Sequence, residues 1–217
     1  MNFIEHKHNR ILPRRINNAT HIILHATGET NLDAIIRFYC SPGAVCPHYI
    51  ISYNGDIHAI ISEDSIAWHT AYSTAHTELY KLGFSEWSKW RIKSGTLEKS
   101  AKNDFYAQWY ARWPDIDDPR NLCSSKPNFS SIGIEMQSLE NPTDKIFTPQ
   151  QYATLTHLLK SISLRRFINL NKNSVLGHSD VDPISRFNWD PGSKFDWNFV
   201  YSSFNELNNN VLSIETK

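Results

Sequence analysis

The sequence predicts an α/β fold in which a mixed central β-sheet is flanked by helices. Short apolar runs with the period of two that is typical of strands alternate with longer segments of helical spacing. Their order, β-α-β-β, a long segment, then β-α-β-α, favours a mixed sheet covered by helices. The 217 residues are compatible with a single domain over 1–217, which at this size can bury roughly 70% of its unfolded surface.

Three segments fall outside this pattern. Residues 1–19 are expected to form an N-terminal arm, and residues 208–217 a polar tail. Residues 73–130 form an insertion between the third and fourth strands, with four of the seven tryptophans in two helix-like stretches. We expect either a helical pair that packs on the sheet or a wall of a binding cleft.

The first half of the chain predicts a strand, a helix and a hairpin. Residues 20–27 alternate as strands do. A helix of amphipathic spacing follows, with Asn31 as its cap. Residues 48–61 contain two β-branched and aromatic runs around Asn54 and Gly55. This pair tolerates the positive φ angles of a type I′ turn, so the segment predicts a hairpin.

The second half predicts two strands and two helices. Residues 131–137 form a strand, and a shorter one follows at 174–178. Between them, Thr148 and Gln151 are spaced as the capping box of a helix. A final helix is expected at about 193–207.

Composition excludes several functional classes. Lys and Arg together number 22, as do Asp and Glu, which argues against nucleic-acid binding by bulk electrostatics. Apolar runs of only a few residues predict no membrane span. Three cysteines, an odd number, fit a reducing compartment. The N-terminus lacks the apolar stretch of a secretory signal, so we expect a cytoplasmic protein. Export by another route, or release by phage lysis, stays open.

Three residues at the ends of predicted elements are candidate metal ligands. His25 closes the first strand, His178 follows the short strand, and Asp190 comes twelve residues later. A catalytic zinc site takes three such ligands and leaves a fourth position to water. The ends of neighbouring strands can bring distant ligands together. Spacing alone does not establish such a site, because a lone histidine at a strand end more often has a structural or surface role.

Glu135 lies in an otherwise apolar strand, on the face opposite Ile132 and Ile134. A carboxylate there is costly to bury unless it is paired or lies near a cation. It is therefore either a residue of a solvent-facing or edge strand, or a general base whose pKa is set by partial burial and a metal.

Taken together, these segments resemble the zinc-dependent N-acetylmuramoyl-L-alanine amidases of the second type. This family contains the AmpD-like amidases and the peptidoglycan recognition proteins. The resemblance rests on five blocks in the family's order: "IILHAT", "CPHYIISYNGDIHAII", "IAWHTA", "SIGIEMQS" and "GHSDVDP…DPGSKFDW". It implies one Zn²⁺ per chain held by His25, His178 and Asp190, and it places Glu135 on the family's catalytic glutamate.

The resemblance also implies positions for substrate binding. His48 and the Trp68–His69 pair fall on blocks that flank the family's substrate groove. Both histidines could instead support the sheet and loop, and Trp68 could equally anchor the loop in the core.

Two features depart from the family pattern. AmpD-like members commonly carry a lysine two residues before the aspartate ligand, where it helps to stabilise the oxyanion. Asn188 stands at that position here and could donate a neutral hydrogen bond. Arg186, as a catalytic group, or Lys194, as a substrate-binding group, could supply the charge. The second departure is the insertion, which is longer than the family's usual link.

The cysteines give weaker alternatives. Cys40, Cys46 and His48 could form a competing metal site, although their spacing is not that of a zinc finger and a fourth ligand is absent. A Cys40–Cys46 disulfide is conceivable in an exported protein. No cysteine lies in a motif that pairs it with a base.

The function implied by the resemblance is hydrolysis of the amide between N-acetylmuramic acid, or its 1,6-anhydro form, and L-alanine. The partner is then polymeric peptidoglycan or a muropeptide fragment, and we expect a monomer. A second hypothesis is a muropeptide-binding module without catalysis, which needs no zinc. The presence of all three ligands and the glutamate argues for an enzyme. An exported effector would share the same chemistry.

Overall fold

A computed structural model of the chain describes residues 1–6, 17–70, 127–138, 146–182, 186 and 190–212. Most of the predicted insertion at 73–130 therefore lies outside the described residues. So does Asn188. In the described part, no helix is long and apolar enough to cross a membrane.

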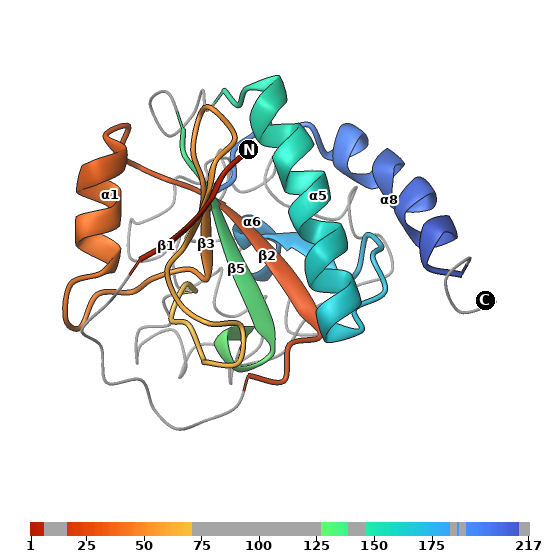
Figure 1. The fold of residues 1–217 in the computed structure, drawn as a ribbon, viewed down its shortest axis with the longest axis horizontal. Helices are drawn as coiled ribbons and strands as arrows, with labels where there is room; N and C mark the ends of the chain where they lie inside the picture. The colour runs from red at the N-terminus through yellow and green to blue at the C-terminus, as the bar shows by residue number, and fades with distance from the viewer. Residues whose placement is uncertain (7–16, 71–126, 139–145, 183–185, 187–189, 213–217) are drawn as a thin grey trace, which may run out of the picture.

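Six strands form one mixed sheet, in the order β1-β4-β3-β5-β2-β6 (Figure 1). The strands are β1 (Phe3–Glu5), β2 (His21–Ala26), β3 (Tyr49–Ile51), β4 (Ile57–Ala59), β5 (Ser131–Met136) and β6 (Val175–Gly177). β3 and β4 pair antiparallel, whereas β1–β4, β3–β5, β2–β5 and β2–β6 pair parallel. The predicted mixed sheet is confirmed.

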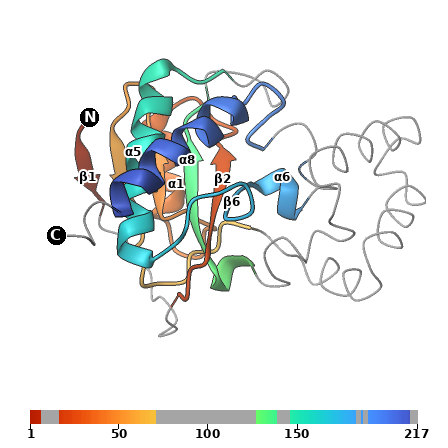
Figure 2. The same cartoon turned by 90° about the vertical axis from the view of Figure 1, so that its right-hand side faces the viewer.

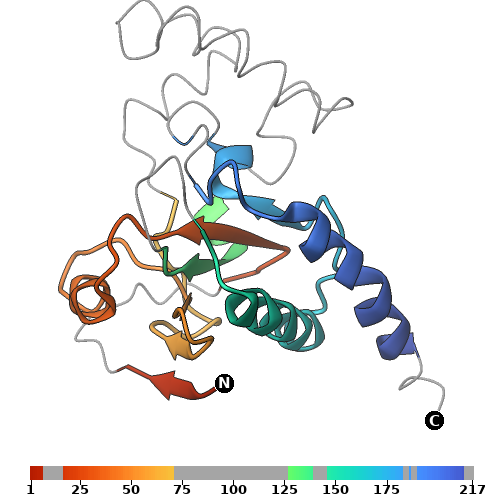
Figure 3. The same ribbon diagram turned by 90° about the horizontal axis from the view of Figure 1, so that it is seen from above.

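Helices cover both faces of this sheet. The helices of the described residues are α1 (Leu32–Tyr39), the 3₁₀ helix η2 (Pro127–Phe129), α5 (Pro149–Arg166), α6 (His178–Val181) and α8 (Trp197–Leu212). Helix α1 lies on one side of the sheet, and α5 and α8 lie on the other (Figures 1 and 3). The result is a three-layer α/β arrangement.

The main core lies between the sheet and the α5–α8 layer. Ile22 and Leu24 of β2 and Ile132 and Ile134 of β5 pack there with apolar residues of α5 and α8. Because side chains of a strand alternate between its faces, the residues between them point toward the α1 side. The predicted alternation of both strands is confirmed, and it directs the polar residues to one face.

The helix caps form as the sequence predicts. The Asn31 side chain accepts a hydrogen bond from the Ala34 amide at 3.1 Å and begins α1. Thr148 and Gln151 form both halves of the capping box of α5. Each cap satisfies backbone donors that have no partner within their helix.

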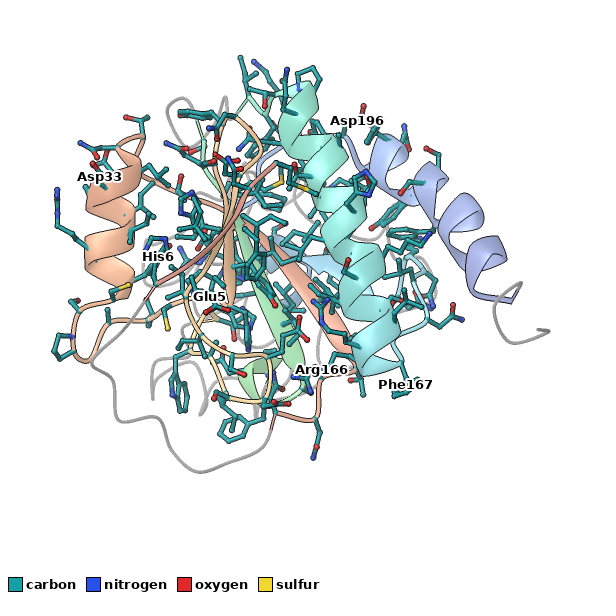
Figure 4. The ribbon with its side chains drawn as sticks, viewed as in Figure 1. Glu5, His6, Asp33, Arg166, Phe167 and Asp196 are labelled. Carbon is teal, nitrogen blue, oxygen red and sulfur yellow. The ribbon has the colours of Figure 1, made fainter. Side chains whose placement is uncertain are left out.

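The far end of α5 is tied to the β3–β4 region by a buried carboxylate. Glu63 accepts hydrogen bonds from Tyr49 Oη at 2.7 Å, Arg165 Nη2 at 2.7 Å and Arg166 Nε at 2.9 Å. Burial opposes its ionisation, but these donors outweigh burial and lower the pKa of Glu63 below its ordinary value. Figure 4 shows Arg166 at this end of the helix, beside Phe167.

Three local features differ from the sequence-based expectations. Part of the expected N-terminal arm forms β1, a strand of three residues, which is too short for an alternation signal. The hairpin forms, but its turn is not type I′, because Asn54 does not have a positive φ. Instead, Gly55 N donates to Ser52 O and Gly55 alone takes a positive φ of 81°, as in a three-residue loop. Helix α8 begins later and ends later than expected, so that it includes part of the predicted tail.

Gly55 should resist substitution more than Gly43. Both have positive φ, 81° and 77°, but a Cβ at Gly55 would lie 2.8 Å from Thr154 Oγ1 and 3.1 Å from Gln150 O, whereas one at Gly43 would meet nothing within 4 Å. We expect Gly43→Ala to lower the free energy of unfolding by about 1 kcal/mol. Gly55→Ala should cost roughly 1–3 kcal/mol more. Urea denaturation measures both, and equal losses would contradict the close approach.

Candidate metal centre and active site

Side chains from distant parts of the chain meet in a cavity of ≈170 Å³. His25 comes from the end of β2, and His178 is the first residue after β6 (Figure 2). Asp190 comes from the loop before α8. The carboxyl ends of the parallel strands β2 and β6 meet at one edge of the sheet, which is where open α/β sheets place their ligands.

The three predicted ligands converge. Asp190 Oδ2 lies 2.8 Å from His178 Nδ1 and 3.6 Å from His25 Nδ1. One ligand atom from each residue lies within 4.8 Å of the others, and all three residues are buried. Ligand atoms of a tetrahedral zinc site are about 3.3 Å apart, given bonds of about 2.0–2.1 Å. The distances and the donor set of two imidazoles and one carboxylate therefore fit such an ion.

Asp190 is held in position by the backbone of β2. Its Oδ1 accepts a hydrogen bond from the Ala26 amide at 2.9 Å, which leaves Oδ2 facing the two imidazoles. Burial tends to raise the pKa of Asp190, but the neighbouring His178 and His25 outweigh burial and hold it well below the usual range. The group is thus a buried carboxylate, which is the form that binds a cation.

Glu135 lies beside this group, as the sequence predicts. It stands opposite His25 in the register of β2 and β5, it lines the same cavity, and only 8% of it is exposed. Tyr39 Oη donates a hydrogen bond to Glu135 Oε1 at 2.9 Å. Burial, together with the charge of Glu135, raises the pKa of Tyr39 well above its ordinary value. The phenol therefore keeps its proton and stays a donor.

Tyr39 is a site residue that the sequence reasoning missed. A signal was available, because Tyr39 continues the helical spacing of Leu32, Ile35 and Ile36 on the buried face of α1. A tyrosine on such a face needs a polar partner for its hydroxyl group. Only the fold shows that this partner is Glu135.

His69 contacts a metal ligand directly. Its Nδ1 lies 2.9 Å from His25 Nε2, and its Nε2 lies 3.1 Å from Ser131 Oγ. His69 is 7% exposed, and its ring packs on Gly133. The substrate-binding position that the resemblance implied for His69 stays a prediction: His69 lines the cavity and also contacts His25.

His48 and Trp68 do not line the cavity. His48 is fully buried and links strands: its Nδ1 accepts from the Gly133 amide at 3.0 Å, and its Nε2 lies 3.1 Å from Ser65 O. Burial lowers the pKa of His48 to about 4. Trp68 is 41% exposed and packs edge-on against Phe129. His48 thus supports the sheet, and the substrate contacts expected of His48 and Trp68 stay predictions.

The two cationic candidates for stabilising the oxyanion, Arg186 and Lys194, differ in their position relative to the cavity. Arg186 is half-buried and lines the cavity, whereas Lys194 is exposed and does not line it. Asn188 lies outside the described residues.

The cysteine alternatives are wrong. No disulfide joins Cys40 and Cys46. Among the described residues, the group that meets the geometry of a metal site is His25, His178 and Asp190, and it includes no cysteine.

Solved structures share this fold. The endolysin amidase LysCS from Clostridium intestinale superposes with a TM-score of 0.54 at 17% identity, over 94% of this chain and 95% of its own. Selenomethionine AmpD superposes with a TM-score of 0.51 at 19% identity, over 93% of this chain and 94% of its own. The amidase AmiD from E. coli superposes with a TM-score of 0.52 at 20% identity, over 90% of this chain and 61% of its own. It was solved with anhydro-N-acetylmuramic acid-L-Ala-D-gamma-Glu-L-Lys.

The family assignment comes from the sequence as a whole. No curated protein matches the chain. The family model described as N-acetylmuramoyl-L-alanine amidase matches residues 15–193, a range that contains His25, Glu135, His178 and Asp190. The match covers most of the chain, and these four buried residues line one cavity on the shared fold. The chain therefore belongs to the N-acetylmuramoyl-L-alanine amidase family.

Proposed function

We propose that this amidase cleaves the bond between N-acetylmuramic acid and L-alanine with one Zn²⁺ held by His25, His178 and Asp190. The observation that carries this proposal is the convergence of the three buried ligands beside Glu135 in one cavity. When bound, Zn²⁺ supplies a Lewis acid for the scissile carbonyl and lowers the pKa of water.

Glu135 acts as the general base. Its carboxylate takes a proton from the attacking water as the new C–O bond forms. It returns that proton to the amide nitrogen as the C–N bond breaks, so that the L-alanine amine leaves neutral. The hydrogen bond from Tyr39 limits the orientations of the carboxylate.

Arg186 is our proposed oxyanion partner. Charge develops on the carbonyl oxygen as water adds, and a cation that lines the same cavity can stabilise this charge. Arg186 lines that cavity and Lys194 does not.

The substrate is proposed to be a muropeptide with the N-acetylmuramoyl-L-alanine linkage, either soluble or part of the polymer. The anhydro-muropeptide bound to AmiD supports the soluble form, and the endolysin LysCS supports the polymer. A monomeric state stays a prediction. A cytoplasmic location stays a prediction.

The alternative function, a binding module without catalysis, would need no ligand set beside a buried glutamate, and no observation favours it.

Substitution of the proposed base tests the mechanism. Glu135→Gln keeps the shape of the side chain but removes its basicity, so the rate should fall by about 100-fold or more while the zinc content stays that of the wild type. Mass spectrometry of stem peptides released from sacculi and from anhydro-muropeptides measures turnover. A chelator should abolish release, and added Zn²⁺ should restore it. Near wild-type release by Glu135→Gln, or indifference to the chelator, would refute the proposal.

Paired substitutions test the oxyanion partner. We expect Arg186→Ala to lower kcat by about 100- to 1000-fold, because an oxyanion donor is lost. Lys194→Ala, at an exposed position outside the cavity, is the control and should change kcat by less than about threefold. Steady-state kinetics on a purified anhydro-muropeptide compares them. The reverse order of effects would transfer the role to Lys194.

Tyr39→Phe tests the hydrogen bond to Glu135. A hydrogen bond to a charged group contributes about 1.5 kcal/mol or more, so we expect kcat to fall roughly tenfold with zinc content unchanged. Tyr201→Phe, which alters a phenol of α8 that lies 3.4 Å from Val175 O, is the matched control and should keep its kcat. Equal kinetics of the two variants would contradict an active-site role for Tyr39.

A further inference from the structure

A chain of hydrogen bonds runs from a metal ligand into the interior. His25 Nε2 lies 2.9 Å from His69 Nδ1, and His69 Nε2 lies 3.1 Å from Ser131 Oγ. The hydroxyl group of Ser131 then lies 2.6 Å from Pro127 O. His25, His69 and Ser131 are 1%, 7% and 0% exposed, so water does not compete for these contacts.

The last acceptor in this series of hydrogen bonds, Pro127 O, determines which atom donates in each of them. A carbonyl oxygen only accepts, so the Ser131 hydroxyl must donate to Pro127 O. Because Ser131 has only this one hydroxyl proton, its Oγ must accept the hydrogen bond with His69, and His69 Nε2 must donate it. A neutral imidazole carries one N–H, so His69 Nδ1 is the acceptor. His25 Nε2 therefore carries the proton of the next hydrogen bond.

This assignment leaves the Nδ1 of His25 as the atom with a lone pair. That atom is the one that faces Asp190 Oδ2, at 3.6 Å. We propose that His69 is a positioning residue that holds His25 in the tautomer and orientation a metal ion needs. The inference rests on the metal site of the proposed function and is separate from the substrate-binding role implied for His69.

The surroundings of His69 hold it in place. Asn128 Oδ1 accepts hydrogen bonds from the His69 amide at 3.0 Å and the Thr70 amide at 2.9 Å. A Cβ at Gly133 would lie 2.4 Å from His69 Cγ, so only glycine leaves room for the ring.

Nuclear magnetic resonance of the zinc-loaded wild-type chain tests the tautomer without any substitution. With ¹⁵N-labelled histidine, we expect a nitrogen–nitrogen coupling across the hydrogen bond between His25 Nε2 and His69 Nδ1. The proton should be attached to His25. Absence of the coupling, or a proton attached to His69 Nδ1, would overturn the inference.

Substitutions at His69 test its effect on metal affinity. Asn places its Oδ1 where His69 Nδ1 lies and can accept from His25, whereas Gln reaches toward Ser131 instead. Loss of the partner of a ligating histidine typically costs about 10–100-fold in metal affinity. We expect that loss in His69→Ala and His69→Gln, and a zinc Kd within about threefold of the wild type in His69→Asn, measured by chelator competition.

Stability of the metal-free variants separates positioning from packing. If Asn and Gln differ in zinc affinity while their metal-free melting temperatures agree, His69 acts by orienting His25. If the zinc affinity of the variants follows their melting temperature, or if His69→Asn binds zinc no more tightly than His69→Gln, the role of His69 is structural. A wild-type chain that binds no zinc would contradict the proposed function instead, and the coupling between the two rings would then be measured on the metal-free chain.

Discussion

In the parallel pair of β2 and β5, His25 stands opposite Glu135, while their neighbours Leu24 and Ile134 enter the core beneath α5. A slip of one residue would exchange the two faces, so that a charged side chain would enter the core and an apolar one would leave it. The apolar residues that hold the layers together thus also determine which polar groups meet. Burial of the core and assembly of the site are one event, because both depend on this register.

The functional side chains are further oriented by partners from other elements. Tyr39 reaches Glu135 from α1, the Ala26 amide holds Asp190, and His69 reaches His25 from the loop after β4. Buried polar groups are costly unless they are hydrogen-bonded, so these contacts stabilise the fold while they restrict rotation of the site. Preorganisation of this kind is what allows a site to act without rearranging its charges during the reaction.

Alternation and capping were sufficient to predict β2, β5, α1 and α5, because these signals are local. The ligand set and Glu135 needed the family resemblance, since spacing alone left either histidine open to a structural role. Local signals failed where tertiary contacts decide: β1 depends on pairing with β4, and the hairpin turn lies against α5, where Gly55 approaches Thr154. The burial of His48 and the partner of Tyr39 could not be predicted, because both depend on how separate elements pack.

The origin of the three ligands has a thermodynamic consequence. They belong to β2, to the residue after β6 and to the loop before α8, so the unfolded chain offers no comparable site. An ion bound there binds the native state alone, and by mass action it adds RT ln(1 + [ion]/Kd) to stability, about 2.7 kcal/mol at a hundred times the dissociation constant. The concentration of free metal would then determine the stability of the fold as well as the rate of the reaction.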